Sequence, residues 1–156
     1  MIIKLNRRHL EQLVQIDYES EHQNDREHRI TKAQMRKHLG ERFGKEEFYG
    51  YKEGILKGYA TLKPFSGYKH CEIYWLAVRK QYQGQGIGTK LLKFLEQKAK
   101  QQGYRKVFVY TGKNMIRTRQ FYEKNGYKFV NEFPEYYGYS TGEKTAVLYG
   151  KKLNSA

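Results

Sequence analysis

A glycine-rich segment, Gln83-Gly84-Gln85-Gly86-Ile87-Gly88-Thr89, constrains the fold of this chain more than any other feature. The apolar run 73–78 before it predicts a strand, and Leu91, Leu92 and Leu95 after it recur at helical spacing. Glycine lets backbone N–H groups approach a ligand closely, and the first N–H groups of a helix have no intrahelical partner. The segment is therefore predicted to bind an anion, best a phosphate or a pyrophosphate.

The spacing of these glycines excludes the two commonest phosphate-binding loops. A dinucleotide fingerprint requires G-x-G-x-x-G, and here the third glycine, Gly88, comes one residue early. A Walker A loop requires Ser or Thr after its Lys to bind magnesium, and here Leu91 follows Lys90. A different phosphate-bearing ligand is expected.

Two motifs resemble those of one known superfamily. The pattern Gln83-x-x-Gly86-x-Gly88 resembles the acyl-CoA pyrophosphate loop of the GNAT acetyltransferases, which more often have Arg where Gln83 stands. Residues 114–127 are similar to the family's later motif: an Asn after a strand, a short helix that ends in F-Y-E-K, then N-G-Y. The chain is identified as a member of this superfamily over residues 72–152, and the earlier part matches in element order.

Local patterns predict the elements of the fold. Apolar residues flanked by turn residues predict strands over 2–5, 48–52, 57–62, 72–78, 107–111, 127–132 and 145–151. Helical spacing predicts helices over 8–18, 31–43, 87–102 and 116–124, the second with Thr31 as its N-cap. The length of 156 residues predicts one domain, 1–156. The resemblance implies an α/β (α+β) GNAT fold, a mixed, mostly antiparallel seven-stranded sheet flanked by about four helices, with a splay between the central strands.

The net charge of +14 is unevenly distributed. Residues 1–53 carry 11 Lys and Arg against 10 Asp and Glu, whereas residues 54–156 carry 19 against 6. The basic excess therefore falls in the half with both motifs, where it would attract the phosphates of coenzyme A. Since the excess is larger than one cofactor requires, association with nucleic acid or the ribosome is a second explanation, and general solubility is a third that ranks no lower.

Composition excludes several classes of protein. The one cysteine, Cys71, cannot form an internal disulfide, which suits a reducing cytoplasm, and it is expected to be a buried structural thiol. No apolar stretch approaches the length that spans a membrane, and the N-terminus lacks the apolar run of a signal peptide. The five His residues form no H-x-x-x-H or Cys/His cluster, so no metal site is expected.

The resemblance assigns catalytic roles to two residues. Tyr122 stands where family members carry the Tyr that protonates the CoA sulfur, and a hydroxyl with an ordinary pKa of about 10 is a donor at neutral pH. The alternative is an aromatic packing residue. Glu72 stands where some members carry a base glutamate that acts through water. The alternative for Glu72 is a strand-end carboxylate paired with a Lys.

The resemblance also implies a binding site for acetyl-CoA. The pyrophosphate is expected on residues 83–89, through backbone N–H groups. Asn114 matches a CoA-contacting Asn, although in many members that Asn lies one residue nearer to the Tyr. Backbone contacts to the thioester and the pantetheine are expected from three residues of the preceding strand: Leu76, Ala77 and Val78.

The acceptor is expected beside the first two helices and the last hairpin, which form the acceptor side of GNAT enzymes. The first region contains an acidic cluster: Asp17, Glu19, Glu21 and Asp25. Glu19 and Glu21 are expected to attract a cationic amine, with a solvated helix end as the alternative. The hairpin contains the Tyr-rich run 133–139, where Tyr136 and Tyr137 are similar to residues that hold a peptide in protein N-terminal acetyltransferases, including the ribosomal-protein type.

The chain is therefore predicted to be a cytoplasmic N-acetyltransferase that transfers an acetyl group from acetyl-CoA to a primary amine by direct attack. A protein or peptide N-terminus is favoured over a small amine such as a polyamine, an antibiotic or an amino acid. The His that eukaryotic peptide enzymes carry before the Asn is absent, which weakens the case for a peptide. An RNA- or ribosome-binding module on the same fold is the competing class, and a homodimer and a longer acyl group stay open.

Overall fold

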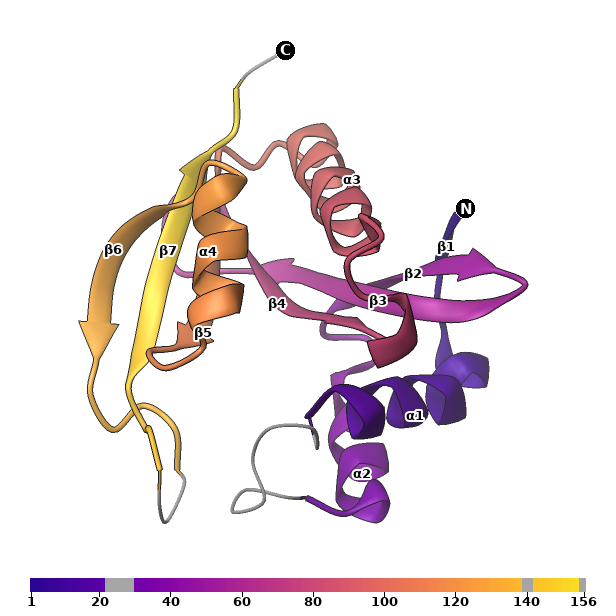
Figure 1. Ribbon diagram of the computed structural model, residues 1–156. Coiled ribbons are helices and arrows are strands. Elements are labelled where there is room, and N and C mark those ends of the chain that lie inside the picture. The colour runs from indigo at the N-terminus through magenta and orange to yellow at the C-terminus, as the bar shows by residue number, and fades with distance from the viewer. Residues whose placement is uncertain (22–29, 139–141, 155–156) are drawn as a thin grey trace. The chain divides into compact units, whose positions relative to one another are not determined.

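The computed structural model describes residues 1–21, 30–138 and 142–154 (Figure 1). The described strands are β1 (Ile2–Lys4), β2 (Glu47–Glu53), β3 (Ile55–Pro64), β4 (His70–Val78), β5 (Lys106–Gly112), β6 (Lys128–Phe133) and β7 (Ala146–Lys152). The described α-helices are α1 (Leu10–Glu21), α2 (Lys32–Arg42), α3 (Ile87–Gln101) and α4 (Ile116–Lys124). The predicted order of elements and the mixed seven-stranded sheet are confirmed, with strand order β1-β2-β3-β4-β5-β7-β6.

The boundaries depart most from the prediction at the first helix and at the central hairpin. The sequence predicts a first helix over 8–18, but a 3-10 turn at Arg7–His9 comes first and α1 continues to Glu21. The turn begins early because the Asn6 side chain accepts a hydrogen bond from the backbone of Arg8. The central hairpin is also longer than predicted, because Gly54 (φ 74°) lets Glu53 and Ile55 pair directly across a tight turn.

The chain divides into two compact units, Met1–Lys63 with Ile73–Gln97 and Pro64–Glu72 with Lys98–Ala156. Strand β4 contributes its first three residues to the second unit and the rest to the first. The expectation of one domain and that of splayed central strands stay predictions.

In the first unit, helices cover both faces of the strands (Figure 1). Helices α1 and α2 lie side by side on one face, where Leu13, Met35 and Leu39 join Phe48 and Tyr59 in one buried cluster. On the other face, the ring of Tyr49 packs edge-on against Phe94 of α3, with 5.1 Å between ring centroids. The successive residues Phe48 and Tyr49 of β2 thus bury their rings on opposite faces, as strand geometry requires.

The start of α2 confirms the predicted N-cap. The Thr31 hydroxyl accepts a hydrogen bond from the backbone of Gln34 at 3.1 Å, and the Gln34 side chain accepts one from the backbone of Thr31 at 2.8 Å. This reciprocal pair satisfies two backbone donors that the helix leaves unpaired. The helix therefore begins at Lys32, as the sequence indicates.

In the second unit, β5 pairs in parallel with the start of β4 and antiparallel with β7, which pairs antiparallel with β6. Helix α4 lies across these strands (Figure 1) and is tied to β7 through Tyr149. The Tyr149 hydroxyl donates to the carboxylate of Glu123 at 2.8 Å and accepts from the guanidinium of Arg119 at 3.0 Å. One buried ring thus fixes two turns of α4.

We expect Leu95→Ala to destabilise the first unit by about 2–5 kcal/mol, because Leu95 is fully buried and its truncation leaves a cavity beneath α3. Urea unfolding followed by circular dichroism measures the loss. Lys93→Ala on the exposed side of the same helix is the matched control and should change stability little. Equal effects of the two substitutions would contradict the packing assigned to α3.

Candidate functional site

The glycine-rich loop joins β4 to α3 within the first unit. Gly84 and Gly86 have φ angles of 77° and 81°, which side chains other than glycine rarely adopt. An added Cβ at either position would meet no heavy atom within 4 Å, so the backbone there is open on the outside. The conformation, and not crowding, requires glycine at these two positions.

The loop presents the N-terminus of a well-anchored helix. Ile87 is buried, and the backbone N–H of Lys90 donates to the carbonyl of Gly86 at 3.0 Å, which makes this the first intrahelical bond at this end. The N–H groups of Ile87, Gly88 and Thr89 precede that bond and have no intrahelical acceptor. With the positive end of the helix dipole, they suit the charge of a phosphate.

The predicted cofactor-contacting residues of β4 lie directly before the loop. Leu76 and Val78 are half-buried and Ala77 is buried. The Gln83 side chain donates to the carbonyl of Val78 at 3.0 Å, which ties the loop back to the end of the strand. Gln83 thus contributes a structural contact.

The residues of the predicted acidic cluster do not share one environment in the structure. Glu19 forms an ion pair with Arg79, which also donates to the carbonyl of Leu56. Glu19 therefore holds the end of β4, and its proposed role toward the acceptor stays a prediction. Glu21 ends α1, and Asp25 lies outside the described residues.

Tyr122 lies on α4 in the second unit and is almost completely buried. Its ring packs edge-on against Phe121 and Tyr127, with centroids 5.2 Å and 5.4 Å away. Burial raises the pKa of Tyr122, because the phenolate would lose its solvation. The hydroxyl therefore remains protonated at every physiological pH, as a proton donor requires. Asn114 is exposed in the turn before α4, where its carbonyl accepts from Ile116.

Glu72 is buried near the start of β4 and lies opposite Phe108 in the parallel register with β5. Its negative charge, together with burial, raises the pKa of Tyr110, which stands two residues after Phe108. The sequence did not single out Tyr110. The sequence does show that Tyr110 and Phe108 share a face of β5, since residues two apart in a strand point to the same side. The β4–β5 register was needed to show that Glu72 lies on this face as well.

The Tyr-rich run folds back onto the same unit. Tyr136 stacks on Tyr110, with centroids 4.8 Å apart and planes 19° from parallel, and Tyr137 packs edge-on against Tyr136. The structure thus packs Tyr136 between Tyr110 and Tyr137. Tyr139 lies outside the described residues.

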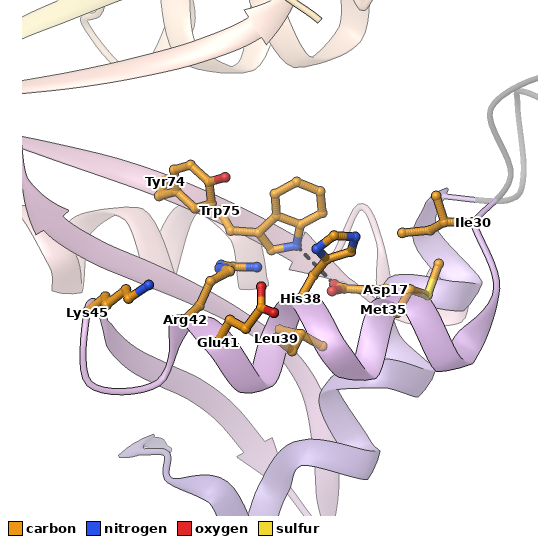
Figure 2. Close-up of a pocket in the computed structure, with 10 residues that line it drawn as sticks. All are labelled: Asp17, Ile30, Met35, His38, Leu39, Glu41, Arg42, Lys45, Tyr74 and Trp75. Atoms are coloured by element: carbon orange, nitrogen blue, oxygen red, sulfur yellow. Dashed lines mark hydrogen bonds between the residues drawn. The ribbon is translucent and has the colours of Figure 1, made fainter. Parts of the chain in front are cut away.

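A cavity of about 360 Å³ opens in the first unit between α2 and β4 (Figure 2). Helix α2 and the turn after it supply one wall, and β4 supplies two aromatic rings. The lining residues combine both charges with apolar groups: Asp17, Ile30, Met35, His38, Leu39, Glu41, Arg42, Lys45, Tyr74 and Trp75.

Asp17 lies at this cavity with its carboxyl group fully engaged. It accepts from the Trp75 indole at 2.9 Å (Figure 2) and from the Tyr59 hydroxyl at 2.7 Å. Burial raises the pKa of Asp17 to about 6, and the bonds from Tyr59 and Trp75 oppose that rise. Asp17 is one of the residues of the predicted acidic cluster, but it continues the helical spacing of Leu13 and Val14, and that spacing was the available signal for a buried carboxyl.

Arg42 is the principal buried cation of the cavity wall. Its guanidinium forms two bonds with the carboxylate of Glu46, at 2.7 Å and 2.9 Å. Its Cζ also lies 4.8 Å from the ring centroid of Tyr74 and 5.7 Å from that of Trp75. The arrangement holds the two rings of β4 against α2 by cation–π attraction.

Three further expectations concern the cysteine, a metal site and membrane-spanning segments. Cys71 is buried as expected, and burial raises the pKa of its thiol to about 12. Among the described residues, no group of three or more His, Cys, Asp or Glu side chains could hold a metal ion. None of the described helices combines the length and the hydropathy needed to cross a membrane.

The chain belongs to the Acetyltransferase (GNAT) family, since the model of that family matches residues 8–127. A curated relative, N-acetyltransferase family 8 member 2 of Rattus norvegicus, is 31% identical over 104 residues, which are 67% of this chain and 45% of the relative. The chain thus spans less than half the length of that relative.

Solved structures share the fold. The ribosomal-protein-S18-alanine N-acetyltransferase from Escherichia coli superposes with a TM-score of 0.80 and 16% identity, over 100% of this chain and 95% of that one. A GNAT family acetyltransferase from Elizabethkingia anophelis with acetyl-CoA bound gives a TM-score of 0.68 and 24% identity, over 75% and 82%. At these identities the likeness shows the fold alone.

We expect Asp17→Asn to remove a pH dependence of stability between about pH 4 and pH 6. The folded protein raises the pKa of Asp17 from 3.8 to about 6, so the native state binds the extra proton in this window. Stability therefore falls as pH rises through the window, by up to about 1.4 kcal/mol per pH unit, and is flat above it. Urea unfolding of both proteins at closely spaced pH values measures the difference.

The control for this experiment is Glu11→Gln. Glu11 is exposed and its pKa is lowered by the hydrogen bond from Arg36, so its contribution has the opposite sign. Identical pH profiles for wild type and Asp17→Asn would show that the carboxyl group is not buried as described.

Proposed function

We propose that this protein is an N-acetyltransferase that moves an acetyl group from acetyl-CoA to an amine. The observation that carries the proposal is the loop of residues 83–89, where two glycines with positive φ deliver the N-terminus of α3. The segment contains no acidic side chain, so nothing in it repels a pyrophosphate. The structural relative from Elizabethkingia anophelis with acetyl-CoA bound supports the choice of cofactor.

In the proposed mechanism, the first unit binds the cofactor. The backbone N–H groups of residues 86–89 hold the pyrophosphate, and those of β4 at Leu76 and Val78 contact the thioester carbonyl and the pantetheine. Acetyl-CoA supplies an acyl group activated by a thiol leaving group. A backbone donor aimed at the thioester oxygen stabilises the charge that develops there during attack.

Tyr122 and Glu72 are assigned the proton transfers. The Tyr122 hydroxyl, kept neutral by burial, donates its proton to the leaving thiolate. The Glu72 carboxylate, buried on β4, takes the proton of the acceptor amine, directly or through one water. The amine attacks the thioester carbon directly, without a covalent enzyme intermediate.

For the acceptor we favour the N-terminus of a protein or peptide over a small amine. The likeness to the ribosomal-protein-S18-alanine N-acetyltransferase supports this choice, as does the exposed aromatic surface at Tyr136 and Tyr137. The cavity beside α2 offers a second region, where an acceptor would meet the rings of Tyr74 and Trp75. A panel of an N-terminal alanyl peptide, spermidine, lysine and an aminoglycoside, assayed by release of the CoA thiol, identifies the acceptor.

We expect Gly86→Glu to lower the affinity for acetyl-CoA by about tenfold or more, equal to at least about 1.4 kcal/mol. The substitution adds a negative charge at the predicted phosphate site and strains the loop, since φ at Gly86 is 81°. Isothermal titration with acetyl-CoA measures the affinity.

Gly103→Glu is the matched control, because Gly103 has a φ of 86° and equally open surroundings but follows the other end of α3. It introduces the same charge and a similar strain, and it should bind acetyl-CoA like the wild type. Absence of acetyl-CoA binding by the wild type, or an equal loss of affinity in both variants, would contradict the assignment of the loop as the pyrophosphate site.

We expect Tyr122→Phe to reduce kcat by about 10²-fold or more while acetyl-CoA binding is retained, because only the proton donor is removed. Tyr127→Phe removes a hydroxyl from the neighbouring buried ring and should leave kcat near that of wild type. Steady-state release of CoA thiol gives kcat, and titration gives the affinity. A variant with unchanged kcat would assign Tyr122 to packing instead.

A further inference from the structure

One face of the second unit combines a buried carboxyl with a row of aromatic side chains. The ring of His70 packs edge-on against Phe108, with centroids 5.0 Å apart, so His70 and Phe108 share this face. Glu72 is two residues after His70, and Tyr110 is two residues after Phe108, which places both on the same face. Burial and, after it, the negative charge of Glu72 raise the pKa of Tyr110.

The carboxyl group and the two tyrosines on this face become more exposed in order. Glu72 is 5% exposed, Tyr110 is half-buried and Tyr136 is 50% exposed. The rings of Tyr110 and Tyr136 stack with centroids 4.8 Å apart. Burial raises the pKa of Tyr110, and a side-chain interaction with Tyr136 opposes that rise. A group that accepts a proton in every catalytic cycle must release it to water, and Glu72 has little direct access to solvent.

We propose that Tyr110 and Tyr136 form the path by which Glu72 returns its proton to solvent after each acetyl transfer. This inference rests on the role of Glu72 as the base in the proposed function. Neither tyrosine touches the reacting atoms, so both act through Glu72 as positioning and proton-transfer residues.

The proton transfer balances with water as the only other reactant: water receives the proton that the amine gave to Glu72, and it returns one to Tyr122 in place of the proton given to the thiolate. The acceptor amine loses a proton to a Glu72 oxygen as its nitrogen bonds to the acetyl carbon. The protonated Glu72 then donates to the Tyr110 oxygen, Tyr110 passes its own proton to Tyr136, and Tyr136 passes one to water. Afterwards each hydroxyl donates toward the carboxylate, and both hydroxyls rotate back before the next cycle.

The test compares three single variants: Tyr110→Phe, Tyr136→Phe and Glu72→Gln. A double variant combines Tyr110→Phe with Glu72→Gln. Phenylalanine keeps the stacked rings and removes only the hydroxyl. The assay uses saturating acetyl-CoA and the fastest acceptor of the panel above, with kcat, KM and the solvent isotope effect as readouts. Tyr68→Phe removes an exposed hydroxyl elsewhere in the second unit and is the control.

We expect each tyrosine variant to lose about tenfold or more in kcat with little change in KM, and to show an altered solvent isotope effect. The double variant should be no slower than Glu72→Gln alone, because Tyr110 acts only through Glu72. Tyr68→Phe should match the wild type.

Three results would overturn the inference. Wild-type kcat in Tyr110→Phe, with Glu72→Gln slow, would leave Glu72 as the base and remove the path. Losses that add in the double variant would show that Tyr110 acts independently of Glu72. Wild-type kcat in Glu72→Gln would remove the base itself, which is a failure of the proposed function. If Glu72→Gln does not fold, the kcat of Tyr136→Phe still tests the path, since this variant changes only an exposed hydroxyl group. Wild-type kcat in Tyr136→Phe would then overturn the inference.

Discussion

The buried carboxyl group of Asp17 is the interaction on which the architecture of the first unit depends. It joins three elements, because Asp17 lies on α1, Tyr59 on β3 and Trp75 on β4. A carboxylate can remain inside a protein only if donors replace its lost solvation, and two side chains do so here. The hydrogen bonds therefore fix how α1 sits on the strands, and with it the position of β4 just before the glycine-rich loop.

Features that depend on local sequence could be predicted well. The loop at Gly84 and Gly86 and the cap at Thr31 are set by residues within one turn of each other, so their chemistry can be read along the chain. The order of strands and helices follows for the same reason. Errors arose at ends, such as the 3-10 turn before α1, where a single side chain, Asn6, competes with the helical pattern.

Features that depend on pairing between distant segments could not be predicted. Tyr110 becomes relevant only when the register places Phe108 beside Glu72 and the Tyr-rich run returns to stack on it. The partners of Asp17 lie 42 and 58 residues away. The ion pair of Glu19 with Arg79 likewise spans 60 residues, and it turned an apparently free acidic residue into a structural one. Sequence patterns give the elements, whereas long-range register decides which side chains meet.

The reactivity of the buried Cys71 thiol can be used to measure local opening of the second unit. The chain has one thiol, it is fully buried on β4 between residues that pair with β5, and its pKa is raised to about 12, so almost no thiolate forms in the closed state. Reaction with a thiol reagent thus requires a local opening that exposes this part of β4. The rate of modification would measure how often that opening occurs, without any label or added cysteine.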